Sequence, residues 1–413
     1  MRKAEPLTLP LGQQVWEAQW SPSGDRIFSI SASGTNAQLR LWDARTGAPV
    51  GPTRQIESEA FFAQWSPDGT RIAAALLNGA TIWDAKTGQQ LCSRLRHESR
   101  LVHCTFSPNG ELLATAAEDL TVRLWDGHNG TPIGTPLVHS HIPLKISFSH
   151  DGHRLASAGM DGTIRVWSVP EGKLVLGPLH HGGVCWVAAF SPDDRWLLSA
   201  SSDNTAQLWD ATTGKPAFSA LRHESAVLWA SFSPDGRAIA TSTELGTARV
   251  WDTATGQLLS EPMHHPGKVW FIKWSSDGRF LATTCVDGSA HIWDAFTGHL
   301  VAEPFLHNAE TRRAEFSPDG RRLLTASFDG TVKVWDLALL RSPLPVPEWL
   351  PLLAESLGGK RLGEKDSLES VPGDTFQSVR TNIEQRAGQD YYGRWAHWLL
   401  HERFERPVRA FQP

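Results

Sequence analysis

Short apolar runs separated by polar turn signals recur along most of the chain, and residues 148–167 illustrate the pattern. Asp151-Gly152 and Asp161-Gly162 are typical tight-turn dipeptides, because both central positions of such turns favour a positive φ. The runs between them are short and rich in β-branched and apolar residues, which indicates strands. A third glycine turn follows Trp167. Three turns predict four antiparallel strands in each segment of this kind.

This segment repeats with a nearly constant period. The first gap between the repeating Trp residues is 41 residues and the next six are 42, which places Trp at positions 42, 83, 125, 167, 209, 251, 293 and 335. Asp follows this Trp in seven repeats, and Ser168 replaces it once. Each Trp is preceded by a marker similar to Ser-Pro-Asp-Gly, which begins at Ser21, Ser66, Ser107, Ser149, Ser191, Ser233, Ser275 and Ser317. A period of about 40 residues is the size of one four-stranded propeller blade.

The two markers together resemble the WD40 repeat family over about residues 6–337. The resemblance implies a closed ring of four-stranded blades, one for each of the eight repeats. The predicted fold class is all-β: an eight-bladed WD40 β-propeller closed by an N-terminal strand, with a small α-helical C-terminal extension. We expect the propeller to occupy residues 1–341 and the helical tail residues 342–413.

The sequence also predicts how the ring closes. The last repeat has no glycine turn after Trp335, so it lacks an outer strand of its own. Residues 5–10 resemble the outer-strand segment 261–265. We therefore expect the N-terminal strand to complete the blade built from residues 307–336, because pairing satisfies an open sheet edge.

A His, a Ser or Thr and an Asp lie 28, 10 and 6 residues before the repeating Trp. Such residues could be mistaken for a hydrolase triad. A catalytic site, however, needs one special copy with an exposed nucleophile. The WD40 resemblance implies instead that matching positions form a buried, hydrogen-bonded tetrad within each blade. Five repeats carry the full set: His97/Thr115/Asp119/Trp125, His139/Ser157/Asp161/Trp167, His181/Ser199/Asp203/Trp209, His265/Thr283/Asp287/Trp293 and His307/Thr325/Asp329/Trp335.

Three repeats depart from this pattern. The sixth keeps His223, Thr241 and Trp251 but has Leu245 where the others have Asp. The first two repeats lack both the His and the Asp, and their second hairpins differ in length from the others. We expect these two blades to be less rigid than the rest or to be shaped by a partner.

The resemblance implies that the top face of the propeller binds peptides through residues around the channel mouth. Five residues after the tetrad His, or at the aligned position, the eight repeats carry Trp16, Phe61, Val102, Leu144, Trp186, Leu228, Trp270 and Arg312. Two residues earlier, five of the eight positions are polar or charged: Gln14, Glu59, Arg100, Lys268 and Glu310. An apolar, Trp-rich centre with a mixed-charge rim suits a protein or peptide partner. The alternative is that these side chains pack sideways onto neighbouring blades.

Three further Trp residues, Trp20, Trp65 and Trp274, occupy positions where other repeats have Phe, and we expect them in the core. Beyond about residue 341 the period stops. Apolar spacing predicts short helices around residues 349–357, 376–383 and 391–399, with a polar loop over residues 360–374. This tail resembles the C-terminal ends of bacterial WD40 signalling proteins, which often carry a serine/threonine kinase domain. The chain has none of the kinase motifs.

Composition narrows the function classes. The net charge of −5 and the absence of a continuous Lys/Arg track disfavour nucleic acid as a partner. The sequence has no apolar run long enough to span a membrane and no apolar stretch suited to a signal peptide. Four cysteines without metal-ligand spacing indicate free thiols, and hence a reducing compartment. We expect no cofactor, no metal and no membrane contact.

The function that the sequence favours is a non-catalytic, cytoplasmic, monomeric WD40 scaffold that binds proteins or peptides through its top face. Three alternatives remain open. They are the sensor region of a bacterial kinase-type signalling protein, a module that associates with itself through its tail, and an enzyme with a site in the central channel. The last would require carboxylates or histidines that break the repeat pattern at the channel.

Overall fold

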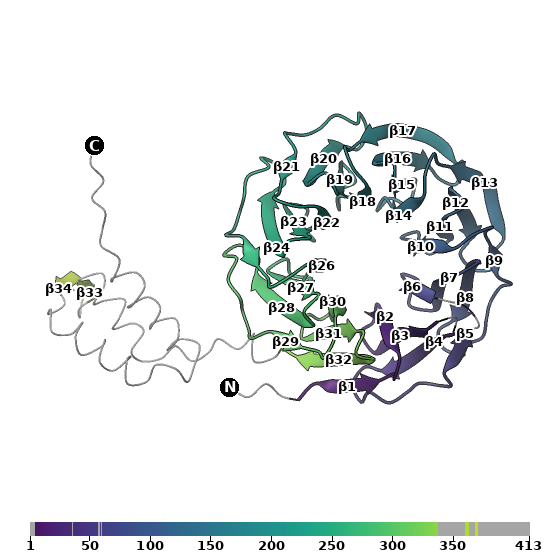
Figure 1. Cartoon of the computed structure of the whole chain (residues 1–413), viewed down its shortest axis with the longest axis horizontal. Helices are drawn as coiled ribbons and strands as arrows, with labels where there is room; N and C mark the ends of the chain where they lie inside the picture. The colour runs from purple at the N-terminus through teal and green to yellow at the C-terminus, as the bar shows by residue number, and fades with distance from the viewer. Residues whose placement is uncertain are drawn as a thin grey trace. The chain divides into compact units, whose positions relative to one another are not determined.

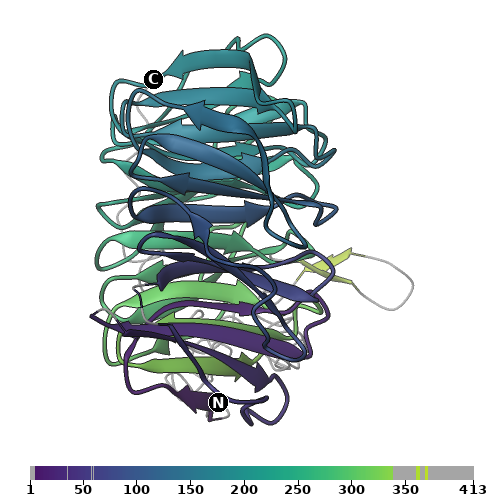
Figure 2. The ribbon, with the colours of Figure 1, turned by 90° about the vertical axis from the view of Figure 1, so that its right-hand side faces the viewer.

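The computed structural model describes residues 5–34, 36–56, 58, 60–337, 360–362 and 368–370. Residues 5–338 form one compact unit, which contains eight four-stranded antiparallel sheets arranged as blades around a central channel (Figure 1). The edge-on view shows the strands running between two faces that consist of loops (Figure 2). The WD40-type, eight-bladed propeller predicted from the sequence is confirmed.

The strands of each blade follow one another from the channel outward. Blades 1 to 4 consist of β2 (Gln14–Trp20), β3 (Arg26–Ser33), β4 (Asn36–Asp43) and β5 (Arg54–Ile56); β6 (Ala60–Trp65), β7 (Arg71–Leu76), β8 (Gly79–Asp84) and β9 (Leu95–Arg96); β10 (Leu101–Phe106), β11 (Leu112–Ala117), β12 (Thr121–Asp126) and β13 (Pro132–Val138); β14 (Pro143–Phe148), β15 (Arg154–Gly159), β16 (Thr163–Ser168) and β17 (Lys173–His180).

The remaining blades have the same order. Blades 5 to 8 consist of β18 (Cys185–Phe190), β19 (Trp196–Ser201), β20 (Thr205–Asp210) and β21 (Leu221–Arg222); β22 (Val227–Phe232), β23 (Ala238–Thr243), β24 (Thr247–Asp252) and β25 (Met263–His264); β26 (Val269–Trp274), β27 (Phe280–Cys285), β28 (Ser289–Asp294) and β29 (Phe305–Leu306); β30 (Thr311–Phe316), β31 (Arg322–Ser327), β32 (Thr331–Asp336) and β1 (Leu7–Pro10). We call the face that carries the loops between the second and third strands of each blade the top face.

The ring closes through the N-terminal strand, as predicted. β1 pairs antiparallel with β32, from Leu7 opposite Val334 to Pro10 opposite Thr331. Leu9 is fully buried in a cluster that joins apolar residues of blade 8 to those of blade 1. A side chain at Gly47 would collide with Leu7 and Leu9, so the glycine turn of blade 1 packs directly on β1. One strand therefore completes blade 8 and fastens it to blade 1.

Two residues that depart from the marker sequence, His150 in blade 4 and Asp194 in blade 5, interact with each other. Asp194 stands where most markers have Gly and adopts a positive φ of 57°, a strained conformation for a residue with a side chain. Its carboxylate accepts hydrogen bonds from the backbone amides of His150 and Asp151 in blade 4, at 2.7 and 2.8 Å. His150 replaces the usual proline of the marker, which has no amide hydrogen to donate. The pair therefore forms a link between blades 4 and 5.

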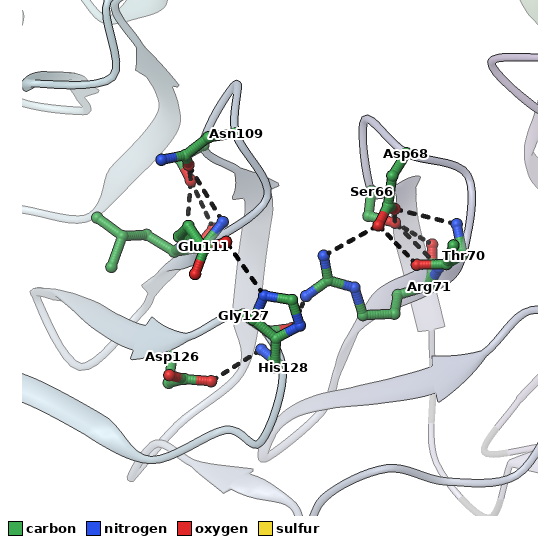
Figure 3. Close-up of polar contacts among 11 residues, drawn as sticks. Ser66, Asp68, Thr70, Arg71, Asn109, Glu111, Asp126, Gly127 and His128 are labelled. Carbon is green, nitrogen blue, oxygen red and sulfur yellow. Dashed lines mark hydrogen bonds and ion pairs between the residues drawn. The ribbon is translucent and has the colours of Figure 1, made fainter.

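Arginine side chains link blades 1 and 2, which lack the tetrad, to their neighbours on the face opposite the top face. Each of these arginines lies at the start of the second strand of one blade and donates to a backbone carbonyl of the next blade. The bonds join Arg322 to Ala44, Arg26 to Ala85 and Arg71 to Gly127. Figure 3 shows Arg71 reaching from its own hairpin, where it meets Asp68, to the turn of blade 3. These bonds restrain the two blades that the sequence predicts to be less rigid.

The three Trp residues predicted for the core are buried, with 5–6% of their surface exposed. Their indole N–H groups donate to the inner strand of the preceding blade: Trp20 to Glu315, Trp65 to Gln19 and Trp274 to Ser231. Phenylalanine at the same position of other repeats cannot make this bond, so these Trp residues are links between blades as well as core.

The helices predicted within residues 342–413 lie outside the described residues. Two described segments of this region, β33 (Lys360–Leu362) and β34 (Leu368–Ser370), form a short antiparallel hairpin where the sequence predicts a polar loop. The described residues include no helix with the length and apolar composition that a bilayer crossing requires.

Candidate functional site

Three blades contain the complete hydrogen-bonded tetrad. In blade 3 the Trp125 indole donates to Thr115 Oγ1 at 2.7 Å, and Thr115 Oγ1 lies 2.8 Å from His97 Nε2. His97 Nδ1 donates in turn to Asp119 Oδ2 at 2.9 Å. The same contacts occur in blade 5 among His181, Ser199, Asp203 and Trp209, and in blade 8 among His307, Thr325, Asp329 and Trp335.

The hydroxyl group of each tetrad is not available to a substrate. Thr115, Ser199 and Thr325 are fully buried and already accept the indole N–H of the same blade. A catalytic hydroxyl needs an open approach and oxyanion donors nearby. The tetrad therefore acts as an internal strut that satisfies polar groups within the blade.

Two of the five predicted tetrads lack the contact between His and Asp. In blade 7, His265 Nδ1 lies 3.2 Å from the carbonyl oxygen of Gly246, and Asp287 accepts hydrogen bonds from Ser289. The sequence gives the reason. In complete tetrads the amide after the His also donates to the Asp, but residue 266 is proline and has no amide hydrogen. The hydrogen bonds that join Thr283 to His265 and to Trp293 are present.

Blade 4 departs for a different reason. His139 Nδ1 lies 3.0 Å from the carbonyl oxygen of Leu137, while Asp161 accepts from the Ser140 hydroxyl and pairs with Arg165. Ser140 therefore replaces His139 as a hydrogen-bond donor to Asp161. The bonds among His139, Ser157 and Trp167 are kept.

The tetrad of blade 6 has no contact between His and Asp, because Leu245 replaces the Asp. Leu245, in the Asp position, is 70% exposed on the top face. His223 faces Arg249, and its buried Nε2 has no hydrogen-bond partner among the described residues. An apolar side chain thus projects into solvent where most blades hold a structural carboxylate.

The eight positions predicted for the channel mouth share one backbone feature. Each lies at a β-bulge near the start of an inner strand, as the third residue of β2 and the second residue of the other seven strands: the residues are Trp16, Phe61, Val102, Leu144, Trp186, Leu228, Trp270 and Arg312. A bulge leaves one residue out of the pairing and redirects its side chain. The propeller therefore presents one irregular position per blade where its inner strands meet the top face.

A cavity of about 440 Å³ brings one group of these residues together. It is lined by Trp16, Arg100, Trp186, Ser202, Ala226, Leu228, Trp229, Glu244, Lys268, Trp270, Phe271, Arg312 and Arg313. Seven of the ten predicted contact residues are in this set. The cavity thus extends over blades 5 to 8 and blade 1, with Arg100 of blade 3 on the other side of the channel.

The other three predicted residues lie elsewhere. Val102 packs against the apolar cluster that blades 3 and 4 share, which agrees with the sideways packing considered as the alternative. Leu144 is partly exposed but does not line the cavity. The backbone of Phe61 lies in β6, and its side chain, like residue Glu59, is outside the described residues.

Cations of the chain lie over the aromatic rings of this cavity. The Arg312 guanidinium lies 4.4 Å from the Trp270 ring centroid, 5.7 Å from that of Trp16 and 5.4 Å from that of Phe328. The Lys268 ammonium lies 4.6 Å from the Trp270 centroid. Contacts of this kind are attractive because the face of an aromatic ring carries a partial negative charge. At the channel mouth, tryptophan rings and positively charged side chains are therefore in contact with each other.

The channel below the mouth contains charged residues that the sequence analysis missed. Glu17 of blade 1 pairs with Arg313 of blade 8 at 2.8 Å, and Lys145 lies 3.9 Å from the Trp229 ring centroid. Burial lowers the pKa of Lys145 to about 7, and repulsion by Arg313 adds to this effect. Burial raises the pKa of both Glu17 and Glu315. The missed signal is the presence of charged residues within the inner strands, such as Glu17 in β2 and Lys145 in β14.

A second top-face cavity, of about 500 Å³, adjoins the first at Trp16. It lies between blades 8 and 1 and is lined by Gly12, Gln13, Gln14, Trp16, Ala32, Ser33, Gly34, Phe328, Asp329 and Gly330. The long second hairpin of blade 1 forms one wall. Trp16, which lines both cavities, meets Phe328 edge to face, with the two ring centroids 4.8 Å apart. The described residues contain no group of three or more His, Cys, Asp or Glu side chains placed to hold a metal ion.

Comparison with known proteins agrees with the architecture. A sequence profile described as the IFT122 first beta-propeller matches residues 101–341. No curated protein sequence matches the chain. The crystal structure of the computationally designed protein Ika8 is similar with a TM-score of 0.71 and 23% identity, over 81% of this chain and 100% of Ika8. At that identity the likeness concerns the fold alone. Because the profile match extends over more than half of the sequence, the chain belongs to the family of the IFT122 first beta-propeller.

Proposed function

We propose that this propeller is a non-catalytic scaffold that binds a protein or peptide through the cavity at its channel mouth. The observation that carries the proposal is the gathering of Trp16, Trp186 and Trp270 around one cavity with four cations. Tryptophan and arginine are the residues that most often dominate binding energy at protein interfaces. Trp186 is 37% exposed, an uncommon state for so large an apolar side chain.

The rim of the same face is also apolar in places. Met160, Leu245 and Val286 project from the loops between the second and third strands of blades 4, 6 and 7, with 43, 70 and 41% of their surface exposed. Exposed apolar groups on one face are typical of an interaction surface. Leu245 supports this most strongly. It is exposed at the position where most blades have the tetrad Asp, and the buried Nε2 of His223 in the same blade has no hydrogen-bond partner among the described residues.

The enzymatic alternative has less support. The channel does contain the carboxylates and the histidine that this alternative requires, including Glu17, Glu315 and His103. Glu17 is held by Arg313, and Glu315 accepts the backbone amide of Trp20, so both carboxylates have structural partners. We also propose a cytoplasmic location, which agrees with four free cysteines, three of them buried.

Partner capture tests the proposal. We expect the immobilised full-length protein to retain specific proteins from source-cell lysate, and the Trp16→Ala/Trp186→Ala/Trp270→Ala variant to lose them at least tenfold. A matched control replaces three exposed apolar residues away from the cavity, in the variant Leu174→Ala/Val175→Ala/Phe296→Ala. Circular dichroism first establishes that both variants are folded. Equal retention by all three proteins would exclude the mouth as the binding site.

A further inference from the structure

The aromatic groups at the mouth are already occupied by cations of the chain itself. Arg312 lies within 5.7 Å of the centroids of Trp16, Trp270 and Phe328, so it fills the space that these rings surround. Deeper in the channel, Arg313 lies 4.5 Å from the Phe271 centroid and 5.7 Å from those of Phe62 and Trp229. Aromatic cages normally attract a positively charged ligand. Here each cage holds an internal arginine, which leaves no vacancy for a cation.

The charges that line the cavity have one predominant sign. Arg100, Lys268, Arg312 and Arg313 are cations, and Glu244 is the single carboxylate among the lining residues. Each cation also has a carboxylate partner: Lys268 pairs with Glu244 at 2.7 Å, Arg312 with Glu310 at 2.8 Å, Arg313 with Glu17 at 2.8 Å and Arg100 with Glu118 at 3.8 Å. Glu310, Glu17 and Glu118 lie outside the lining, so a ligand in the cavity meets the cations more than their partners, which favours an anionic ligand.

One polar group at the wall supports the same conclusion. The indole N–H of Trp270 is buried and has no hydrogen-bond partner among the described residues. A buried donor without an acceptor costs about 1–3 kcal/mol. A ligand that places an acceptor oxygen on this group recovers that cost, and a carboxylate is the strongest such acceptor that a side chain offers.

We propose that the channel mouth binds an acidic peptide segment, whose Asp or Glu carboxylates approach Arg312, Lys268 and Arg100. This inference rests on the proposed function and specifies the chemistry of the partner. Trp186, the most exposed tryptophan of the cavity, contacts an apolar residue of the same segment. Nucleic acid fits less well, because base stacking requires open ring faces and two of the tryptophans are covered by cations.

Fluorescence anisotropy with labelled octaglutamate, octaglutamine and octalysine tests this proposal on the full-length protein. We expect octaglutamate to bind and to weaken as salt is raised, and the other two peptides not to bind. The Lys268→Gln/Arg312→Gln variant should raise the Kd for octaglutamate roughly tenfold. Arg312→Lys, which keeps the charge, should stay within about threefold of the wild-type Kd.

The control variant Lys215→Gln/Arg237→Gln removes the same charge from exposed positions away from the mouth and should bind as the wild type does. Equal loss for Lys268→Gln/Arg312→Gln and Arg312→Lys, no binding of octaglutamate, or tighter binding of a thymidine octanucleotide would each overturn the proposal. Partner capture that depends on the three tryptophans would still uphold the proposed function in these cases. The two proposals therefore fail separately.

Discussion

A variant without residues 1–11 should lose the cooperative unfolding of the propeller or melt roughly 10 °C below the full-length protein. The deletion removes β1, exposes the edge of β32 and uncovers the apolar side chains of blade 8. Burial of Leu9 alone is worth about 2–5 kcal/mol, by analogy with the replacement of buried leucines by alanine. Because blade 8 and blade 1 share this cluster, both blades lose packing at once.

Calorimetry on four proteins separates strand closure from a general loss of residues. Leu9→Ala should lower the melting temperature strongly, whereas Leu306→Ala, on an outer strand where the leucine is 61% exposed, should not. A synthetic peptide of residues 1–11 should restore stability to the deletion variant by adding a strand to the open edge. An unchanged melting temperature in the deletion variant would show that β1 does not close the ring.

Acidification from pH 7 to pH 4 should destabilise the propeller by several kcal/mol. Burial is the largest cause of a lowered pKa for six tetrad histidines: His97, His139, His181, His223, His265 and His307. The pKa falls to about 4 for His139 and His223 and to about 3 for His265. Arg165 and Arg249 add repulsion near the first two, and His291 near the third.

The sign of the effect follows from proton uptake. Below about pH 6.5 the unfolded chain protonates these histidines and the folded chain does not, so the free energy of unfolding falls as the pH falls. Each histidine whose pKa is near 4 contributes a loss of roughly 3 kcal/mol between pH 6.5 and pH 4. The raised pKa values of Glu17 and Glu315 act in the opposite direction, but they concern two groups against six.

Thermal melts from pH 8 to pH 4 measure this dependence. The slope of melting temperature against pH should be smaller in His265→Gln than in the wild type, since the variant has one fewer histidine to protonate on unfolding. The exposed His153→Gln substitution is the matched control for the removal of a histidine. A melting temperature that does not change between pH 7 and pH 5 would contradict the account of the tetrads.

The repeat period carries most of the information about the fold. Because Trp and the Ser-Pro-Asp-Gly marker lie at fixed distances, the number of blades, their turns and the missing outer strand after Trp335 can all be predicted. The partner of each tetrad Asp is less predictable, since it depends on the residue after the His. Ser140 and Pro266 are visible in the sequence, but their effect follows only from the hydrogen bond that the next amide makes in complete tetrads.

The candidate site could be predicted only in part, because equivalent positions in a repeat have unequal neighbours. The bulged residue of each inner strand is set by the repeat, yet Val102 turns onto the adjacent blade while Trp186 and Trp270 line the cavity. The channel charges, such as Glu17 and Arg313, lie on opposite sides of the ring closure and are 296 residues apart in sequence. Their pairing follows from closure of the ring and not from any local pattern.

Hydrogen exchange on the full-length protein, with and without a captured partner, locates the binding site on the propeller. We expect the partner to protect top-face amides near the cavity, in residues 202–204, 244–246 and 328–330, and to leave the marker turns on the opposite face unchanged. Protection confined to the marker turns or to the outer strands would contradict the claim that the channel mouth is the binding site.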